Sequence, residues 1–484
     1  AGSMVNPDLS ITMVGVGDDP GRARYNYARE VHYCTGACLV LERRRFEVLG
    51  GFDAELKPAY YEDCDLQLRL REEGLRSIYQ PASTVIHHLS LTMASPERAA
   101  QKKLQIVRNS QRMRERWGEK VDAMDAVRVV AFYLPQFHPF EENDFWWGKG
   151  FTEWTNVAKA QPNFVGHAQP HLPTELGFYD LRVPEVMQEQ ARLARAHGIA
   201  AFCFYYYWFR GKRLLEMPVE RILETPRFEL PFCLCWANEN WTRRWDGGDG
   251  DSQVLIGQEH SDADDEEVIR DLIRFFRHPG YLRVNGRPVL LVYRVELFPD
   301  IRRTTGIWRA ACRREGVGEV HLVRVDSFEN AIRVDPPATH GFDAAVEFPP
   351  HHVSVPFKDP VKLLNGEFTG RVDDYEELVL RSVDFKDTPY LHYRGIMPRW
   401  DNTPRRQDAA TIFARSTPGA YQAWLEEVLR YTREQNVGDE RLVFVNAWNE
   451  WAEGAHLEPD RKYGRGYLEA TRNALEAHLL EREG

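Results

Sequence analysis

Two carboxylates three residues apart, Glu450 and Glu453, lie among tryptophans near the C-terminal end of this chain. They follow an apolar run, Leu442 to Val445, of the length expected for a buried strand. Sugar chemistry uses both residue types, because rings stack on sugars and paired carboxyl groups transfer protons at the anomeric centre. A strand end with two solvated acids is the simpler interpretation, but Trp448 and Trp451 would be unusual in an ordinary turn. We therefore interpret the two glutamates as a candidate catalytic pair.

This pair has a spacing that suits glycoside cleavage. One carboxyl group protonates the leaving oxygen, and the other assists attack at the anomeric carbon. Retaining enzymes hold the two groups about 5–5.5 Å apart, which a three-residue separation across a bend allows. One acid must remain protonated near neutral pH, and burial beside Trp448 and Trp451 would favour that.

The composition excludes several classes of protein. A chain of 484 residues with 43% hydrophobic and 28% charged residues is globular and long enough for two domains. Its net charge of -11 argues against a nucleic-acid partner, which would need a basic surface. No apolar run reaches the length of a membrane span, and seven scattered cysteines show no disulfide framework. We expect a bacterial cytoplasmic location; residues 1–4 resemble the remnant of an expression tag, so the natural chain is expected to start elsewhere.

From residue 125 to residue 484, apolar runs of strand length alternate with amphipathic helical segments. This alternation predicts a (β/α)8 TIM barrel, and an open doubly wound sheet is disfavoured because no glycine-rich loop follows the first strand. The helical patterns cover residues 183–197, 264–276, 300–315 and 419–434. The predicted strands are 127–134, 200–208, 231–237, 288–293, 319–325, 343–348, 389–395 and 441–447.

The C-terminal ends of barrel strands carry the active site. Aromatic, amide and charged residues gather at or just beyond these ends, so we predict that they bind a glycan. For Glu239, sugar binding is favoured over a salt bridge, whereas the role of Glu347 stays open. The predicted substrate-binding residues are Tyr133, His138, Trp154, Tyr206, Tyr207, Trp208, Trp236, Asn238, Glu239, Asn240, Trp241, Tyr293, Glu347, His392, Arg394, Trp448, Asn449, Trp451, His456 and Glu458.

No metal or other cofactor is predicted. The histidines lack the spacing of a metal-binding motif. The acidic stretch from Asp246 to Asp251 resembles a calcium loop, but Glu259 falls at the wrong register for the bidentate ligand. We interpret that stretch as a solvated loop.

The longest motifs carry a family resemblance. The stretch from Trp448 to Gly454, with Glu458-Pro459, resembles the catalytic motif of glycoside hydrolase family 99, the endo-α-mannosidases. With residues 133–138, 150–154 and 236–241, the region also resembles the WbsX-type domain of bacterial O-antigen and capsule gene clusters. The resemblance implies a retaining enzyme in which Glu453 is the general acid/base. Glu450 would deprotonate the sugar's 2-hydroxyl, which attacks C1 to give a 1,2-anhydro intermediate. Ala452, Ala455 and His456 differ from the residues that are commonest in the family motif. The resemblance therefore does not define the aglycone-side contacts or the substrate.

Residues 5–122 have a separate resemblance. The stretches 34–38, 50–53, 61–66 and 86–88 resemble the acceptor half of a family 2, GT-A type glycosyltransferase. That resemblance implies a small α/β fragment in which Asp63 matches the catalytic base and His88 a metal ligand. The nucleotide-binding half would precede this block on a longer natural chain. Sugar transfer by the fragment alone is therefore not expected.

The sequence thus favours a retaining glycosidase that cleaves α-mannoside-like linkages in a bacterial surface polysaccharide or its precursor. The expected partner is an oligosaccharide or polysaccharide substrate. Two alternatives stay open: a glycosyltransferase or transglycosylase of O-antigen or capsule biosynthesis, and a glycan-binding module without catalytic activity.

Overall fold

The computed structural model describes residues 2–5, 11–22, 25–85, 96–225, 228–242, 254–328, 335–351, 353–385 and 387–480. The chain divides into two compact units. The first comprises residues 1–127, 386–391 and 433–441, and the second comprises the remainder. The first break lies close to the predicted domain boundary, whereas the two later segments of the first unit were not predicted. The predicted loop at residues 246–251 and His88 lie outside the described residues.

The first unit is a small mixed structure with its own core. Its helices are α1 (Arg43–Val48), α2 (Glu62–Glu72) and α3 (Pro96–Asp125). Two antiparallel pairs join β1 (Ser3–Val5) to β2 (Ile11–Met13), and β3 (Arg29–Val31) to β4 (Ser77–Tyr79). Leu68 of α2 and Trp117 of α3 belong to one buried apolar cluster. Among the described residues, these two pairs do not join into one sheet.

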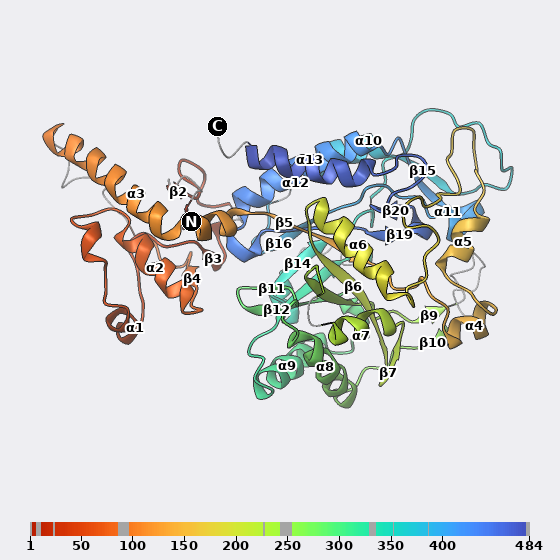
Figure 1. Cartoon of the computed structure of the whole chain (residues 1–484), viewed down its shortest axis with the longest axis horizontal. Helices are drawn as coiled ribbons and strands as arrows, with labels where there is room; N and C mark the ends of the chain where they lie inside the picture. Colours follow the sequence, from red (N-terminus) through yellow and green to blue (C-terminus); the bar gives the residue numbers. More distant parts are fainter. Residues whose placement is uncertain are drawn as a thin grey trace. The chain divides into compact units, whose positions relative to one another are not determined.

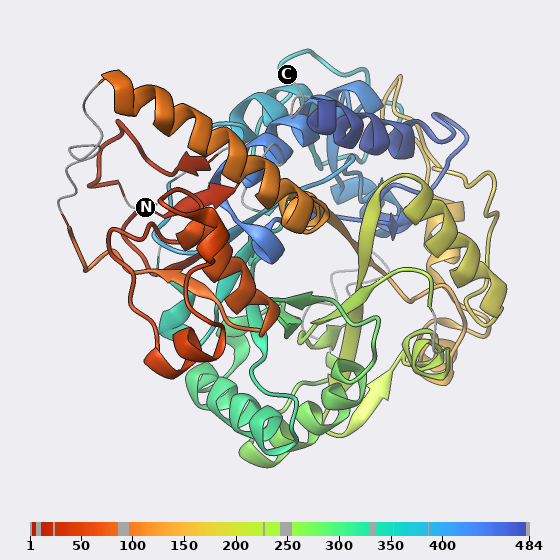
Figure 2. The same cartoon turned by 60° about the vertical axis from the view of Figure 1, so that its left-hand side comes forward.

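The second unit is a closed barrel of eight parallel strands, as predicted (Figure 1). Each strand pairs with the next around the ring, and the last pairs with the first through Val443 opposite Val129. Figure 2 gives a second direction of view. The strands are β5 (Arg128–Tyr133), β6 (Ile199–Phe209), β8 (Phe232–Trp236), β12 (Arg287–Val292), β13 (His321–Asp326), β14 (Ala344–Glu347), β16 (His392–Ile396) and β18 (Leu442–Val445).

The barrel strands are apolar on both faces. Their side chains meet either the barrel interior or the surrounding helices, so nearly every position is buried. In β6, for example, Phe202 and Cys203 are both fully buried although they point to opposite faces. Strands of this kind are recognised from sequence as continuous runs, but the run does not reveal which residues face inward.

Helices surround the strands (Figure 1). They begin and end at residues with clear local signals. In α8, Ser261 accepts a hydrogen bond from the amide of Asp264 at the N-terminus. Helix α6 ends before Gly198, whose φ of +84° and close approach to Leu475 admit no side chain. The outer helices are α6 (Pro184–Ala196), α7 (Met217–Glu224), α8 (Asp262–Phe276), α9 (Ile301–Arg314), α10 (Tyr375–Ser382), α12 (Pro418–Gln435) and α13 (Gly466–Leu480).

Additional segments extend the loops that follow the strands. They include two helices between β5 and α6, and one helix between β16 and α12. Among the described residues that follow β13, only a short 3-10 turn, Pro337–His340, occupies the place of an outer helix. The added elements are α4 (Glu141–Trp147), α5 (Glu153–Lys159), α11 (Thr403–Arg406), β7 (Lys212–Leu214), β9 (Trp241–Thr242), β10 (Val254–Ile256), β11 (Arg283–Val284), β15 (Arg371–Asp374), β17 (Thr411–Ala414), β19 (Asn449–Glu450) and β20 (Ala455–His456).

Candidate active site

A cavity of about 490 Å³ opens where the barrel strands end. Its size falls within the range of small-molecule and glycan sites. Segments that follow seven of the eight strands contribute to its wall, and β6 contributes from within the strand, so the closed barrel brings these distant parts of the chain together. The lining residues are Leu134, Tyr205, Tyr207, Ala237, Glu239, Asn240, Trp241, Thr242, Tyr293, Phe328, Phe348, His351, Trp400, Asn402, Arg405, Arg406, Glu450 and Glu453.

Glu450 and Glu453 both line this cavity and share one cation, Arg405 of α11. Nη1 of Arg405 donates to Glu453 Oε1 at 2.6 Å, and Nη2 donates to Glu450 Oε2 at 3.2 Å. The Arg405 and Glu450 side chains are 12% and 6% exposed, whereas that of Glu453 is 22% exposed. Glu453 is therefore the acid that the cavity reaches most readily.

A third carboxylate, Glu153, lies behind the same guanidinium. Its Oε2 is 3.4 Å from Arg405 Nη2, its side chain is fully buried, and neither of its oxygens has a hydrogen-bond partner. Glu153 is the first residue of α5, where Thr152 and Thr155 form a capping box. Three carboxylates thus surround one positive charge at the wall of the cavity.

This excess of negative charge changes the acidity of the pair. Burial raises the pKa of Glu450 well above its ordinary value; the charge of Glu453 raises it further, and Arg405 opposes both. Burial also raises the pKa of Glu453, against the lowering effect of Arg405. Because each carboxylate disfavours ionisation of the other, the pair retains a proton near neutral pH.

The turn that carries both acids is held by buried hydrogen bonds. The Asn449 side chain accepts from the amide of Leu134 at 2.7 Å and donates to its carbonyl at 3.0 Å, which joins the ends of β18 and β5. The Glu458 carboxylate accepts from Trp451 Nε1 at 2.6 Å and from the Tyr179 hydroxyl at 2.9 Å. These contacts fix the backbone on both sides of Glu450 and Glu453.

Five of the predicted substrate-binding residues line the cavity beside the pair: Tyr207, Glu239, Asn240, Trp241 and Tyr293. Tyr207 and Trp241 meet edge to face with ring centres 5.2 Å apart. Glu239 also pairs with Arg294 at 2.7 Å, so the salt bridge and the cavity position coexist. These five residues supply aromatic faces and hydrogen-bonding groups at the rim.

Other predicted residues face the helices instead, and their expected place in the cavity is corrected. The Tyr206 hydroxyl donates to Asp271 of α8, and Trp208 Nε1 donates to Asp264. Trp236 packs against Trp308 of α9. Side chains alternate along a strand, so the residue next to an inward-facing one points outward. The same reason applies to Tyr133, whose hydroxyl donates to Gln190 of α6.

The predicted cavity position of Glu347, Arg394 and His392 is also corrected. Arg394 Nη1 lies 2.5 Å from Glu347, and Nη2 donates to the Tyr431 hydroxyl of α12, so this pair joins strands to a helix. His392 Nε2 lies 3.0 Å from Asp326. None of the three lines the cavity.

A further group of predicted residues supports the loops without reaching the cavity. Asn238 bonds the amide and carbonyl of Arg294, which joins the ends of β8 and β12. The others are buried in packing or hydrogen bonds behind the catalytic turn or beside it: His138, Trp154, Trp448, Asn449, Trp451, His456 and Glu458. Their placement as cavity residues is corrected, because the turn uses their side chains to hold its own backbone.

Several cavity residues were not predicted. Arg405 stands in a short segment after β16 where nothing in the sequence marks it as a partner of acids 45 and 48 residues away. Glu153 belongs to the acid cluster behind the cavity wall. It precedes Trp154 in the stretch 150–154 that resembles the WbsX-type domain, and that stretch could have drawn attention to it. Tyr205, Trp400 and Phe348 follow or adjoin predicted strand ends, but the inward face could not be told from the outward face.

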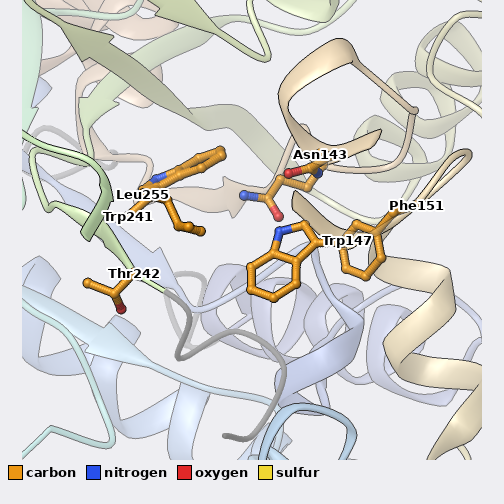
Figure 3. A pocket seen from close by; sticks show the side chains of 7 residues that line it. Asn143, Trp147, Phe151, Trp241, Thr242 and Leu255 are labelled. Carbon is orange, nitrogen blue, oxygen red and sulfur yellow. The ribbon is translucent and has the colours of Figure 1, made fainter. Parts of the chain in front are cut away.

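A small recess adjoins the cavity and shares Trp241 and Thr242 with it (Figure 3). Trp147 and Phe151 lie on one side of it, and Trp241 and Leu255 lie on the other. Its volume of about 10 Å³ corresponds to about one water molecule. It is therefore too small to hold a sugar ring.

Metal binding and membrane insertion can be assessed for the described residues. Within them, no group of three or more His, Cys, Asp or Glu side chains is arranged to hold a metal ion. None of the helices formed by that part of the chain combines the length and the apolar character required to cross a bilayer.

The barrel coincides with a recognised protein family. The family model described as "Glycosyltransferase WbsX" matches residues 129–471, which is most of the second unit. The chain belongs to the WbsX family. Its matched region contains Glu153, Arg405, Glu450 and Glu453, so the whole acid cluster lies within the family domain.

Curated relatives of this WbsX chain are longer. The protein WxcX of Xanthomonas campestris pv. campestris is 52% identical over 351 residues, which covers 72% of this chain and 49% of WxcX. The chain thus spans about half the length of the curated relatives it matches. An N-acetylglucosaminyl-diphospho-decaprenol L-rhamnosyltransferase of Mycobacterium tuberculosis is 43% identical over 60 residues, covering 12% of this chain and 19% of that enzyme.

Among solved structures, the GH99 endo-alpha-mannosidase from Bacteroides thetaiotaomicron covers 74% of this chain and 99% of its own, with 13% identity and a TM-score of 0.44. A structure described as a glycoside hydrolase-like protein covers 73% of this chain and 95% of its own, with 14% identity and a TM-score of 0.46. Because both TM-scores are below 0.5, we assign the barrel fold from the strand pairing of this chain alone.

Proposed function

We propose that this WbsX barrel is a retaining glycosidase that cleaves α-mannose-like linkages in a bacterial surface polysaccharide or its precursor. The observation that carries the proposal is the pair of buried acids, Glu450 and Glu453, held by Arg405 at the wall of a glycan-sized cavity. Two carboxyl groups on one guanidinium favour the short separation of retaining enzymes.

The first chemical step divides between the two acids. Glu450 takes the proton of the substrate's 2-hydroxyl, whose oxygen attacks C1 and forms a 1,2-anhydro sugar. Glu453 gives its proton to the glycosidic oxygen as the C1–O bond breaks. The 2-hydroxyl can attack only from the face opposite the leaving group, so the α-manno configuration is required.

The second step reverses these proton transfers. The Glu453 carboxylate takes a proton from water, whose oxygen attacks C1 and opens the three-membered ring. The released O2 recovers its proton from Glu450. Two inversions at C1 give net retention, and each acid returns to its starting state.

The charge cluster suits these roles. A raised pKa makes the Glu450 carboxylate a stronger base toward a hydroxyl, and it keeps a proton available on the pair for the leaving group. Arg405 donates a hydrogen bond to each acid, so it can stabilise whichever of the two is ionised at a given step. Tyr207 and Trp241 provide ring faces for the sugar.

A glycosyltransferase is the second candidate, because the family model carries that description. Transfer to a sugar acceptor would use the same anhydro intermediate, with a sugar hydroxyl in place of water. A nucleotide-sugar donor would instead require a diphosphate near the acids. Glu153, Glu450 and Glu453 surround a single cation, which disfavours a diphosphate at that position.

The test supplies the purified protein with aryl and disaccharide α-mannosides in one series and with nucleotide sugars plus mannoside acceptors in another. Cleavage of the α-mannosides, without turnover of β-mannosides, supports the glycosidase. Consumption of a nucleotide sugar with no glycoside cleavage contradicts it and supports the transferase.

A further inference from the structure

A second pocket, of about 150 Å³, lies on the other side of Trp400 from the catalytic cavity. Trp400 lines both spaces, so they are separated by one side chain. The wall combines segments that follow β16 and β18, the seventh and eighth barrel strands, with residues 164–171. In barrel enzymes, the loops after these two strands frequently hold phosphate.

Cations dominate the charged groups of this pocket. Arg399, Arg415 and Lys462 line it, against the single carboxylate of Asp401. Arg399 is paired with Asp460, and Arg415 with Asp374, behind the wall. Lys462 lies over the Tyr463 ring at 4.8 Å and has no carboxylate partner among the described residues.

Among the described residues, Asp401 is the one carboxylate that lines the pocket, and its acceptor positions are occupied by neighbouring groups. Oδ2 accepts from Gln169 at 2.6 Å and lies 2.7 Å from His167 Nε2, while Oδ1 accepts from the amide and hydroxyl of Thr403. On its other side, the His167 ring accepts a hydrogen bond at Nδ1 from the amide of Asn163. Although burial alone would raise it, these bonds hold the pKa of Asp401 at about 2.

Buried donors in the wall lack partners. The Arg399 side chain is 5% exposed, and its hydrogen bonds all leave from Nη2, toward His456 and Asp460. Its Nε and Nη1 therefore make none among the described residues, and Nδ1 of the buried His171 also has no partner. Buried polar groups are normally hydrogen-bonded, so these atoms point to an absent acceptor.

The N-terminus of a long helix faces the same space. Ser416 and Thr417, which line the pocket, immediately precede α12, a helix of 18 residues. The helix dipole favours an anion at such an end, although Pro418 has no N–H and the amide of Ala420 already donates to Thr417 Oγ1. Arginines, a lysine and a helix terminus thus converge on one pocket.

We propose that this pocket binds an anionic group, phosphate or carboxylate, carried by the glycan whose reacting sugar occupies the cavity beyond Trp400. The inference rests on the proposed function for the identity of the ligand as a substituted glycan. The loops after the seventh and eighth strands would then form a subsite for charged substituents, and the substrate would be an anionic glycan.

The test measures binding of inorganic phosphate, glucuronate and neutral glucose by isothermal titration calorimetry, to the wild-type protein and to Lys462→Ala and Lys462→Glu. Arg461→Ala is the matched control, because Arg461 is the exposed neighbour on the same loop and does not line the pocket. Loss of one charge-assisted hydrogen bond should weaken anion binding about tenfold in Lys462→Ala, and more in Lys462→Glu. Arg461→Ala should bind as the wild type does.

Each outcome has a defined meaning. Phosphate binding alone identifies a phosphorylated glycan, glucuronate binding alone identifies an acidic sugar, and neither anion binding at tens of millimolar overturns the proposal. Equal weakening by Lys462→Ala and Arg461→Ala overturns it as well. Cleavage of a neutral α-mannoside is measured on the same variants and should not change. If the wild-type protein does not cleave this substrate, the result contradicts the proposed glycosidase activity but not the proposed anion site.

Discussion

At the scale of single residues, the centre of this protein is an imbalance of charge around Arg405. The carboxyl groups of Glu153, Glu450 and Glu453 lie 3.4, 3.2 and 2.6 Å from the same guanidinium. Two like charges about 4 Å apart at an effective dielectric constant of about 20 repel by about 4 kcal/mol. The cluster relieves this repulsion by keeping a proton, which is what a general acid requires.

The two acids should respond differently to replacement. Glu453→Gln should lower kcat for a disaccharide by about 10²–10⁴-fold, because the leaving oxygen is no longer protonated. An aryl mannoside with an acidic leaving group should recover much of that loss. Glu450→Gln should lose activity on both substrates, since the 2-hydroxyl still needs a base. Steady-state kinetics on the substrate pair provides the measurement, and equal rescue of both variants would refute the assignment of roles.

Glu458 should give the protein a pH-dependent stability. Burial raises the pKa of Glu458 to about 7, despite the hydrogen bond from Trp451. A carboxyl whose folded pKa exceeds its ordinary value of 4.5 favours the protonated folded state. The free energy of unfolding should therefore fall by up to about 3 kcal/mol between pH 4.5 and pH 7, and stay level above that.

Denaturant unfolding across this pH range tests the effect. Glu458→Gln should reduce the slope, with Glu450 and Glu453, whose pKa values are also raised, contributing the remainder. Glu469→Gln, a change at an exposed position of α13, should leave the slope as in the wild type. A slope of the same size in Glu458→Gln would mean that another group causes it.

At the scale of elements, the sequence predicted the eight strands and four of the outer helices, because buried parallel strands and amphipathic helices have distinct periods. It did not predict which face of each strand points inward. In β6, we predicted Tyr206, Tyr207 and Trp208, of which only Tyr207 lines the cavity, together with the unpredicted Tyr205. Both faces of the strand are apolar and aromatic, so only the register of the closed barrel decides.

Arg405 illustrates a second limit at this scale. It reaches the acids because α11 lies beside the turn after β18, where the amide of Asp401 donates to the carbonyl of Glu453 at 2.7 Å. That contact joins segments about 50 residues apart and leaves no local pattern. The acids themselves were recognisable because the tryptophans that hold their turn are adjacent in sequence.

The same contact makes Gly454 a sensitive position. Gly454 has a φ of +65°, and a Cβ there would lie 2.9–3.0 Å from Asp401. Gly454→Ala should destabilise the protein by about 3 kcal/mol, from backbone strain plus displacement of Asp401, and should lower kcat. Gly464→Ala is the matched control, because its φ is +55° with nothing within 4 Å of the added Cβ.

Thermal unfolding and kcat separate the two glycines. Gly464→Ala should cost about 1 kcal/mol through the strained backbone alone and retain the wild-type kcat. If the two variants behaved alike in both measurements, the contact between Asp401 and the catalytic turn would have no bearing on activity.

At the scale of the whole molecule, every residue of the acid cluster belongs to the second unit and to the WbsX domain. The first unit contributes none of the residues that line the catalytic cavity. Because this chain spans about half the length of its curated relatives, the activity proposed for it is that of the barrel.

The stereochemistry of cleavage tests the central claim most directly. Proton NMR of the first sugar released from an α-mannoside, recorded before the anomers equilibrate, reports the configuration at C1. Reaction through a 1,2-anhydro sugar inverts C1 twice, so the α anomer should appear first, and Glu450→Gln should release neither anomer. Release of the β anomer first would show a single inversion and would contradict the retaining mechanism built on Glu450 and Glu453.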